Sequence, residues 1–164
     1  MCEDSIKLYL EQLGSSQPTP GGGSASAVVG ALGAALLEKA CNLTIGKEKF
    51  KAVEKDIQQV LEKVLPAKAR LIELVDLDKT AYLPVAKAYK MPKDTGQQKE
   101  ARKQAIDRAM EAAKKVPLEI KKICEGLFAY CGELEKKANP LLISDVRCAK
   151  ELLEAAARAA QNFM

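Results

Sequence analysis

The apolar residues of this sequence recur at helical spacing, and no segment alternates apolar and polar residues over the length of a strand. Residues 50–64 are an example, with an apolar side made of Phe50, Val53, Ile57, Val60, Leu61 and Val64. Ala, Leu, Glu and Lys dominate the chain, and these residues lose little on entering a helix. We therefore expect an all-α fold, an up-and-down helical bundle that forms a single domain over residues 1–164.

Glycine and proline divide the chain into helices. We expect helices over about 5–13, 24–44, 50–64, 67–89, 98–115, 118–137 and 144–160. Ser24 and Ser144 are expected to cap the second helix and the last, as serine commonly does. Pro66 and Pro84 lie inside helical patterns and are expected to bend or break them.

Residues 25–35 have almost no side-chain bulk, and two of them are glycines inside an expected helix. Each interior glycine costs about 1 kcal/mol relative to alanine, so close approach of other backbones must compensate. We expect a long central helix of small residues, buried in the bundle or at a dimer interface. The apolar stretch 25–37 is shorter than the roughly 20 residues that cross a bilayer, which indicates a protein without a membrane partner.

Composition argues against several classes of function. The 26 basic and 22 acidic residues are interleaved along the chain, which is atypical of a nucleic-acid binder. Five cysteines without a CxxC pair suit neither a disulfide framework nor a zinc site. With the acidic start Glu3-Asp4 and no signal peptide after it, they indicate the cytoplasm. Histidine is absent, which removes the commonest general base and metal ligand, so we expect no metal site.

The segment Pro18 to Gly23 is the first candidate for a ligand-facing feature, because it cannot be helical and directly precedes the small-residue helix. Its prolines restrict the backbone and its glycines permit positive φ. Free amides at the helix N-terminus could face an anion, or the segment could be only a tight turn into a crowded helix. No Gly-Lys-Ser/Thr follows, so it is not a Walker loop.

Asp78 is the second candidate. It lies four residues before Tyr82, so the two share a helix face with Leu74 and Val85. A carboxylate on an apolar face is desolvated, which raises its pKa towards the range useful for acid–base catalysis. An ordinary surface aspartate is the alternative. Ser144-Asp145 and Gly46-Lys47 are also candidates, although a helix start and a helix stop explain them equally well.

Taken together and in this order, these segments resemble the formiminotransferase-cyclodeaminase C-terminal domain family. The residues Pro18 to Ala27 match its signature, and the likeness continues through 43–47, 78–82, 91–93, Arg102, 116–118 and 144–145. The resemblance implies a homodimer with a folate site in a cleft near the subunit interface, and no cofactor beyond the tetrahydrofolate-linked substrate. It implies that Asp78 is catalytic and that the substrate is bound by Gly22, Gly23, Ser24, Lys47, Tyr82, Lys93 and Asp145.

The resemblance also implies one of two activities. We expect 5-formiminotetrahydrofolate cyclodeaminase, which defines the family and gives 5,10-methenyltetrahydrofolate and ammonia. The alternative is 5,10-methenyltetrahydrofolate cyclohydrolase, which gives 10-formyltetrahydrofolate. For either activity, the resemblance leaves open whether the substrate is a monoglutamate or a polyglutamate.

Two departures from the family pattern motivate a third alternative. Lys79 replaces a residue that is usually small, and it could pair with a neighbouring carboxylate, change the pKa of Asp78 or face solvent. Family members also usually continue past the position of Asn162 into another helical stretch, whereas this chain ends at Met164. The third alternative is a non-catalytic folate-binding or assembly module of the same fold.

Overall fold

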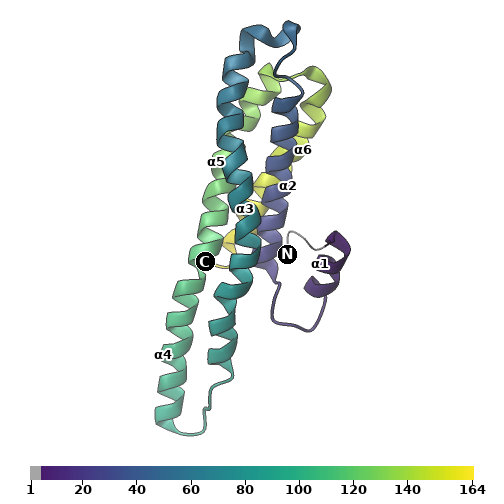
Figure 1. The fold of residues 1–164 in the computed structure, drawn as a ribbon. Helices are drawn as coiled ribbons and strands as arrows, with labels where there is room; N and C mark the ends of the chain where they lie inside the picture. Colours follow the sequence, from purple (N-terminus) through teal and green to yellow (C-terminus); the bar gives the residue numbers. More distant parts are fainter. Residues whose placement is uncertain (1–4) are drawn as a thin grey trace.

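The computed structural model describes residues 5–164, and within that range it contains helices and no strands (Figure 1). The long elements are α1 (Ile6–Leu13), α2 (Gly22–Asn42), α3 (Glu54–Tyr89), α4 (Gly96–Ala113), α5 (Lys115–Lys137) and α6 (Ile143–Gln161). Two short 3-10 helices, η1 (Glu48–Val53) and η2 (Pro140–Leu142), join them. The all-α prediction is confirmed. Cys2, Glu3 and Asp4, which entered the prediction of the compartment, lie outside the described residues.

Helix α2 is the central helix of the bundle, and it packs against α3, α5 and α6 (Figure 1). A Cβ atom built on Gly30 would lie 2.7 Å from Cys124 Sγ on α5, and one on Gly33 would lie 2.8 Å from Leu153 Cγ on α6. The neighbouring helices therefore use the space that a larger side chain would need. This close approach confirms the prediction of a central small-residue helix.

Helix α2 spans 21 residues from Gly22 to Asn42 and is therefore longer than the apolar stretch 25–37. By length and composition alone α2 could cross a bilayer. Half of it is buried inside the bundle, which is also typical of the core helix of a soluble protein.

Helix α3 runs without interruption for 36 residues, so neither Pro66 nor Pro84 breaks it. Of the two outcomes expected at each proline, a bend or a break, the structure excludes the break. Both prolines are exposed. Water can therefore solvate the backbone carbonyl that each proline leaves without its helical N–H donor.

Three helix starts differ from prediction by a few residues. Gly21, not Ser24, is the N-cap residue of α2, and Leu142, not Ser144, is that of α6. The break expected at 116–117 lies at Lys114 instead, and Pro117 falls in the first turn of α5, where proline is tolerated.

The C-terminal end of α3 and all of α4 extend beyond the bundle as a two-helix arm, and α1 lies at the side of the bundle (Figure 1). No residue of α4 is buried, and Val85 and Ala88 are the buried residues of α3 in the arm. The candidate site lies at the base of the arm, where it meets the N-terminal end of α2.

Candidate functional site

A cleft of about 400 Å³ opens where the N-terminal end of α2 meets the base of the arm. The glycine-rich loop, Gly21 to Gly23, forms one side, and α3 contributes Asp78 and Tyr82. Residues 110–117, at the junction of α4 and α5, form the opposite wall, and residues 162–164 line another side. A cleft of this size can hold a small organic ligand.

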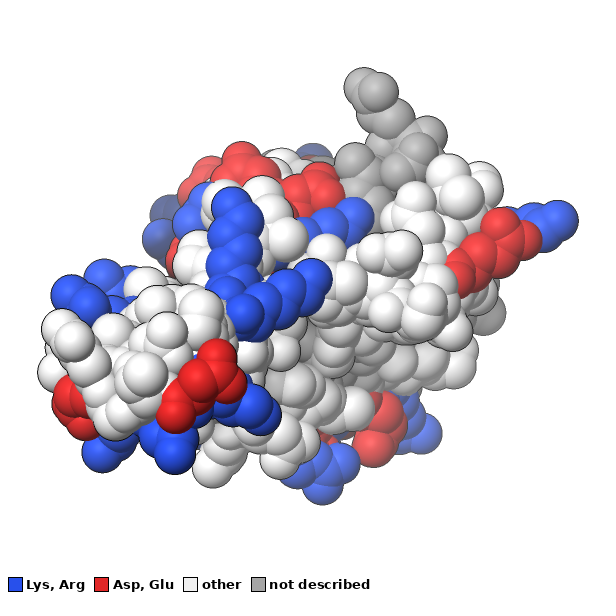
Figure 2. Space-filling view, turned by 90° about the horizontal axis from the view of Figure 1, so that it is seen from below, with Lys and Arg blue, Asp and Glu red and all other residues white. Residues whose placement is uncertain are grey.

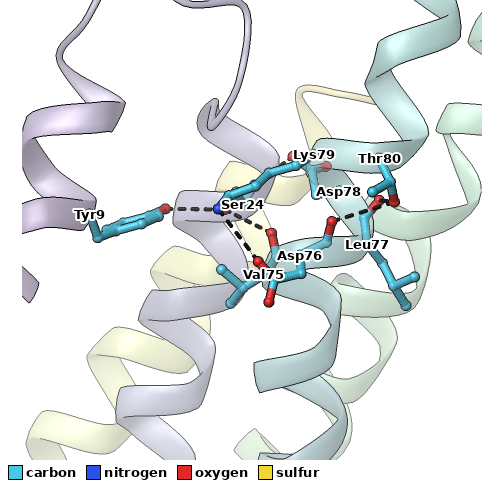
Figure 3. A network of polar contacts seen from close by, with 8 residues as sticks. All are labelled: Tyr9, Ser24, Val75, Asp76, Leu77, Asp78, Lys79 and Thr80. Carbon is cyan, nitrogen blue, oxygen red and sulfur yellow. Dashed lines mark hydrogen bonds and ion pairs between the residues drawn. The ribbon is translucent and has the colours of Figure 1, made fainter. Parts of the chain in front are cut away.

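Asp78 is held at this cleft by the first turn of α2 (Figure 3). Its Oδ2 accepts a hydrogen bond from the backbone N–H of Ser24 at 2.8 Å. That N–H is one of the amides that have no partner within their own helix, so Asp78 caps α2 from a neighbouring helix. The negative carboxylate is also favourably placed at the positive end of the α2 dipole.

The glycines of the loop are explained by close contact rather than by positive φ. A Cβ atom on Gly23 would lie 2.1 Å from Asp78 Oδ1, so a larger residue would displace the carboxyl group. A Cβ atom on Gly22 would lie 2.4 Å from Phe163 Cζ. Gly46 is the glycine with positive φ in the described chain, at 75°, so the loop glycines do not use the positive φ that they permit.

The buried Ser24 side chain joins three helices beneath the cleft (Figure 3). Its hydroxyl donates to the Val75 carbonyl of α3 at 3.0 Å and lies 3.2 Å from Tyr9 Oη of α1. Because the Ser24 proton goes to Val75, the Tyr9 hydroxyl is the donor in the second bond. Sequence reasoning missed this role of Tyr9.

The environment of Asp78 favours its protonated form. Burial raises the pKa of this carboxyl above its ordinary value of 3.8, and the hydrogen bond from Ser24 N–H partly offsets the rise. Burial also raises the pKa of Tyr9, and the negative charge of Asp78 adds to that rise. A carboxyl with a raised pKa exchanges protons closer to neutral pH, so Asp78 can serve as a general acid or base.

Lys79 takes the first of its three predicted roles. Its Nζ lies 3.4 Å from Asp76 Oδ1, one turn back on α3, and its side chain is only 21% exposed.

Within residues 5–164, no three His, Cys, Asp or Glu side chains are grouped so as to hold a metal ion.

The structure brings some of the predicted site residues together and separates others. Gly22, Gly23, Asp78 and Tyr82 line the cleft, with Ser24 directly beneath it.

The other three predicted binding residues do not line this cleft. Lys47 follows the far end of α2, and Asp145 on α6 is paired with Lys39 at 2.8 Å. Lys93 lies in the turn between α3 and α4, at the tip of the arm (Figure 1). Their roles in binding stay predictions.

Sequence reasoning also missed the wall opposite Asp78. Met110, Ala113, Lys114 and Pro117 line it, and Lys114 is the one basic residue among the described residues of the cleft. The resemblance includes residues 116–118, next to this wall, but nothing in their spacing predicts that they face Asp78. This wall and Asp78 line the same cleft because α4 runs back along α3, so that the junction of α4 and α5 returns to the base of the arm.

A family profile described as Formiminotransferase-cyclodeaminase matches residues 5–163, which is nearly all of the chain. The chain belongs to the formiminotransferase-cyclodeaminase family. The resemblance found in the sequence is therefore confirmed. A solved structure of the same family, formiminotetrahydrofolate cyclodeaminase from Thermotoga maritima, has the same fold with a TM-score of 0.84. It is 27% identical, and the match covers 98% of this chain and 76% of that one.

Two curated relatives are named for the two activities that the resemblance implies. Methenyltetrahydrofolate cyclohydrolase of Methylorubrum extorquens is 42% identical over 87% of this chain and 68% of its own length. Formimidoyltransferase-cyclodeaminase of Rattus norvegicus is 30% identical over 94% of this chain. The match spans only 28% of the rat protein, so most of that longer protein has no counterpart here.

Proposed function

We propose that this chain is a folate one-carbon enzyme that acts on the carbon carried between N5 and N10 of tetrahydrofolate. The observation that carries the proposal is the half-buried Asp78 carboxyl, held by the Ser24 amide at the edge of a cleft of about 400 Å³. The names of the cyclohydrolase and cyclodeaminase relatives support this class of substrate.

Of the two reactions, we propose the cyclohydrolase reaction first. The relative with that name is 42% identical, whereas the rat cyclodeaminase and the Thermotoga structure are 30% and 27% identical. This reverses the preference drawn from the sequence alone. The cyclodeaminase reaction is the second candidate, supported by the Thermotoga structure with its TM-score of 0.84.

Asp78 supplies the proton transfers in either reaction. In the cyclohydrolase direction, Asp78 accepts a proton as water adds to the methenyl carbon and returns it to N5 as the bond from N5 to that carbon breaks; the second proton of the water passes to solvent as the formyl carbonyl of 10-formyltetrahydrofolate forms. In the cyclodeaminase direction, N10 attacks the formimino carbon and its proton passes to the formimino nitrogen. Asp78 then gives that nitrogen one more proton as its bond to carbon breaks, and it leaves as ammonia. Both reactions pass through a tetrahedral carbon bonded to the same two nitrogens, so one carboxyl group can serve either.

The test offers both substrates to the purified protein and follows the near-ultraviolet absorption of methenyltetrahydrofolate. Loss of absorption faster than the uncatalysed rate supports the cyclohydrolase. Its appearance from 5-formiminotetrahydrofolate supports the cyclodeaminase. Folate binding in a calorimeter with turnover of neither substrate contradicts both and favours a non-catalytic module.

We also infer that the chain acts as a homodimer in the cytoplasm. Ile6 and Leu10 on α1 are 77% and 58% exposed, and Leu32 on α2 is 51% exposed. A second copy that covers α1 and this face of α2 would remove these side chains from water.

The free cysteines of the described chain, of which Cys148 is exposed, are compatible with a reducing compartment such as the cytoplasm.

A further inference from the structure

The two charged residues of the cleft are of opposite sign and stand on different walls. Among the described residues that line it, Asp78 is the one acid and Lys114 the one base. Asp78 projects from α3, whereas Lys114 lies at the junction of α4 and α5. Seen from the arm end, Lys and Arg side chains reach over a mainly uncharged surface between the arm and the rest of the molecule (Figure 2).

The lysine at this junction remains available to a ligand. Lys114 Nζ lies 3.8 Å from Glu111 Oε2, and the Glu111 side chain is 81% exposed. An exposed pair at this distance contributes little, so an incoming carboxylate can replace Glu111 at small cost. The Lys114 side chain is itself 42% exposed, which leaves its ammonium group accessible from the cleft.

Near the two charged residues, four side chains of the cleft lining are apolar. They are Ala81 of α3 and Met110, Ala113 and Pro117 of the opposite wall. A ligand that matches this arrangement has a proton-exchanging group at one end, an apolar or aromatic middle and an anionic group at the other end.

We propose that Lys114 binds the glutamate carboxylate of the folate substrate and thereby fixes which way round the substrate lies. This inference rests on the proposed function. The one-carbon unit is then directed to Asp78, and the aromatic ring that precedes the glutamate lies against the apolar lining. The reversed orientation would bring the substrate's carboxylates to the Asp78 carboxyl and away from Lys114, the one basic residue among the described residues of the cleft. Lys114 is a binding residue that sets specificity, and it takes no part in proton transfer.

The test compares Lys114→Gln with wild type on two substrates. One is 5,10-methenyltetrahydrofolate, and the other is the same molecule with its glutamate replaced by an uncharged methylamide. We expect Lys114→Gln to raise KM for the folate about 10- to 100-fold, with kcat within twofold of wild type, because the lost contact does not involve the reacting carbon. KM for the methylamide should be high in wild type and unchanged by the variant. The same pair of measurements applies to 5-formiminotetrahydrofolate if the protein is a cyclodeaminase.

The matched control is Lys115→Gln, since Lys115 is the exposed neighbour and does not line the cleft. It should leave both KM values unchanged. Equal increases in KM for both substrates in Lys114→Gln, or no increase for the folate, would overturn the proposal. Failure of the wild-type protein to convert either the folate or its formimino counterpart contradicts the proposed function itself, and the role of Lys114 falls with it.

Discussion

The carboxyl group of Asp78 caps α2 and also faces the cleft. Its contact with Ser24 N–H stabilises the first turn of α2, while burial opposes its negative charge. Because folding raises the pKa of Asp78, its contribution to stability is fully present below the ordinary pKa of 3.8. That contribution is lost as the pH rises through the raised value. At neutral pH the ionised carboxylate therefore lowers the stability of the fold.

Asp78→Asn should relieve this cost, since an amide oxygen can still accept from Ser24 N–H without a buried charge. We expect the variant to be at least as stable as wild type at pH 7. The free energy of unfolding, measured by urea denaturation between pH 3 and pH 8, should shift in favour of the variant as the pH rises. A shift in favour of wild type with rising pH would contradict the assigned direction of the pKa.

Gly23→Ala tests the contact that positions the same carboxyl. The added Cβ would meet Asp78 Oδ1 at 2.1 Å, so Asp78 must move. We expect a loss of about 1–3 kcal/mol in stability, together with a large loss of turnover. Gly126→Ala on α5 is the control, because its Cβ would meet nothing within 4 Å, and it should stabilise the protein by about 0.5–1 kcal/mol. Full activity in Gly23→Ala would contradict the account of the loop.

At the scale of elements, local sequence rules predict where helices lie better than where they begin and end. Residue spacing predicts helical structure throughout the long helices, although it divides α3 in two near Pro66, and Ser5 and Gly14 bound α1 as the rules for caps require. The rules for proline do not decide between a bend and a break at Pro84, where the helix continues. The rules for caps fail at Ser24, because a carboxyl 54 residues away provides the cap.

Two side chains of α1 pack against the core: Tyr9, which is buried, and Leu13, which is partly buried. Tyr9 is the buried residue of α1, whereas Ile6, Leu8 and Leu10 are exposed. Tyr9→Ala should release α1, and hydrogen exchange over residues 6–13 should then become fast while α2 stays protected. Tyr9→Phe should keep α1 docked and lose about 0.5–1.5 kcal/mol for the missing hydrogen bond. Unchanged exchange in Tyr9→Ala would show that something else holds α1.

At the scale of the whole molecule, the sequence predicts the fold class and part of the site. Asp78 and the loop were found because their residue types carry a chemical signal. Lys114 was not, because its position opposite Asp78 depends on how far α3 and α4 extend before the chain returns. Lys47 and Asp145 match family motifs but do not line the cleft. A match to a family motif therefore does not tell whether a residue lies near the cleft in the fold.

The inferred dimer makes a prediction at this scale as well. Leu32→Glu places a charge on the exposed face of α2, where burial against a second copy would require desolvating it. We expect wild type to sediment as a dimer at micromolar concentration and Leu32→Glu to sediment as a monomer. Leu141→Glu, at a leucine that is 82% exposed in η2, should leave the dimer intact. A monomeric wild type would contradict the inference.

The central claim is that Asp78 moves the protons in the cleft, and the turnover of Asp78→Asn tests it most directly. The measurement is kcat for whichever one-carbon folate wild type converts, with Asp76→Asn as the control two residues away on α3. Asp76 pairs with Lys79 and does not line the cleft. We predict that Asp78→Asn remains folded and still binds the substrate, while kcat falls about 100-fold or more. Asp76→Asn should retain most of its activity. A kcat for Asp78→Asn within a few-fold of wild type would contradict the account.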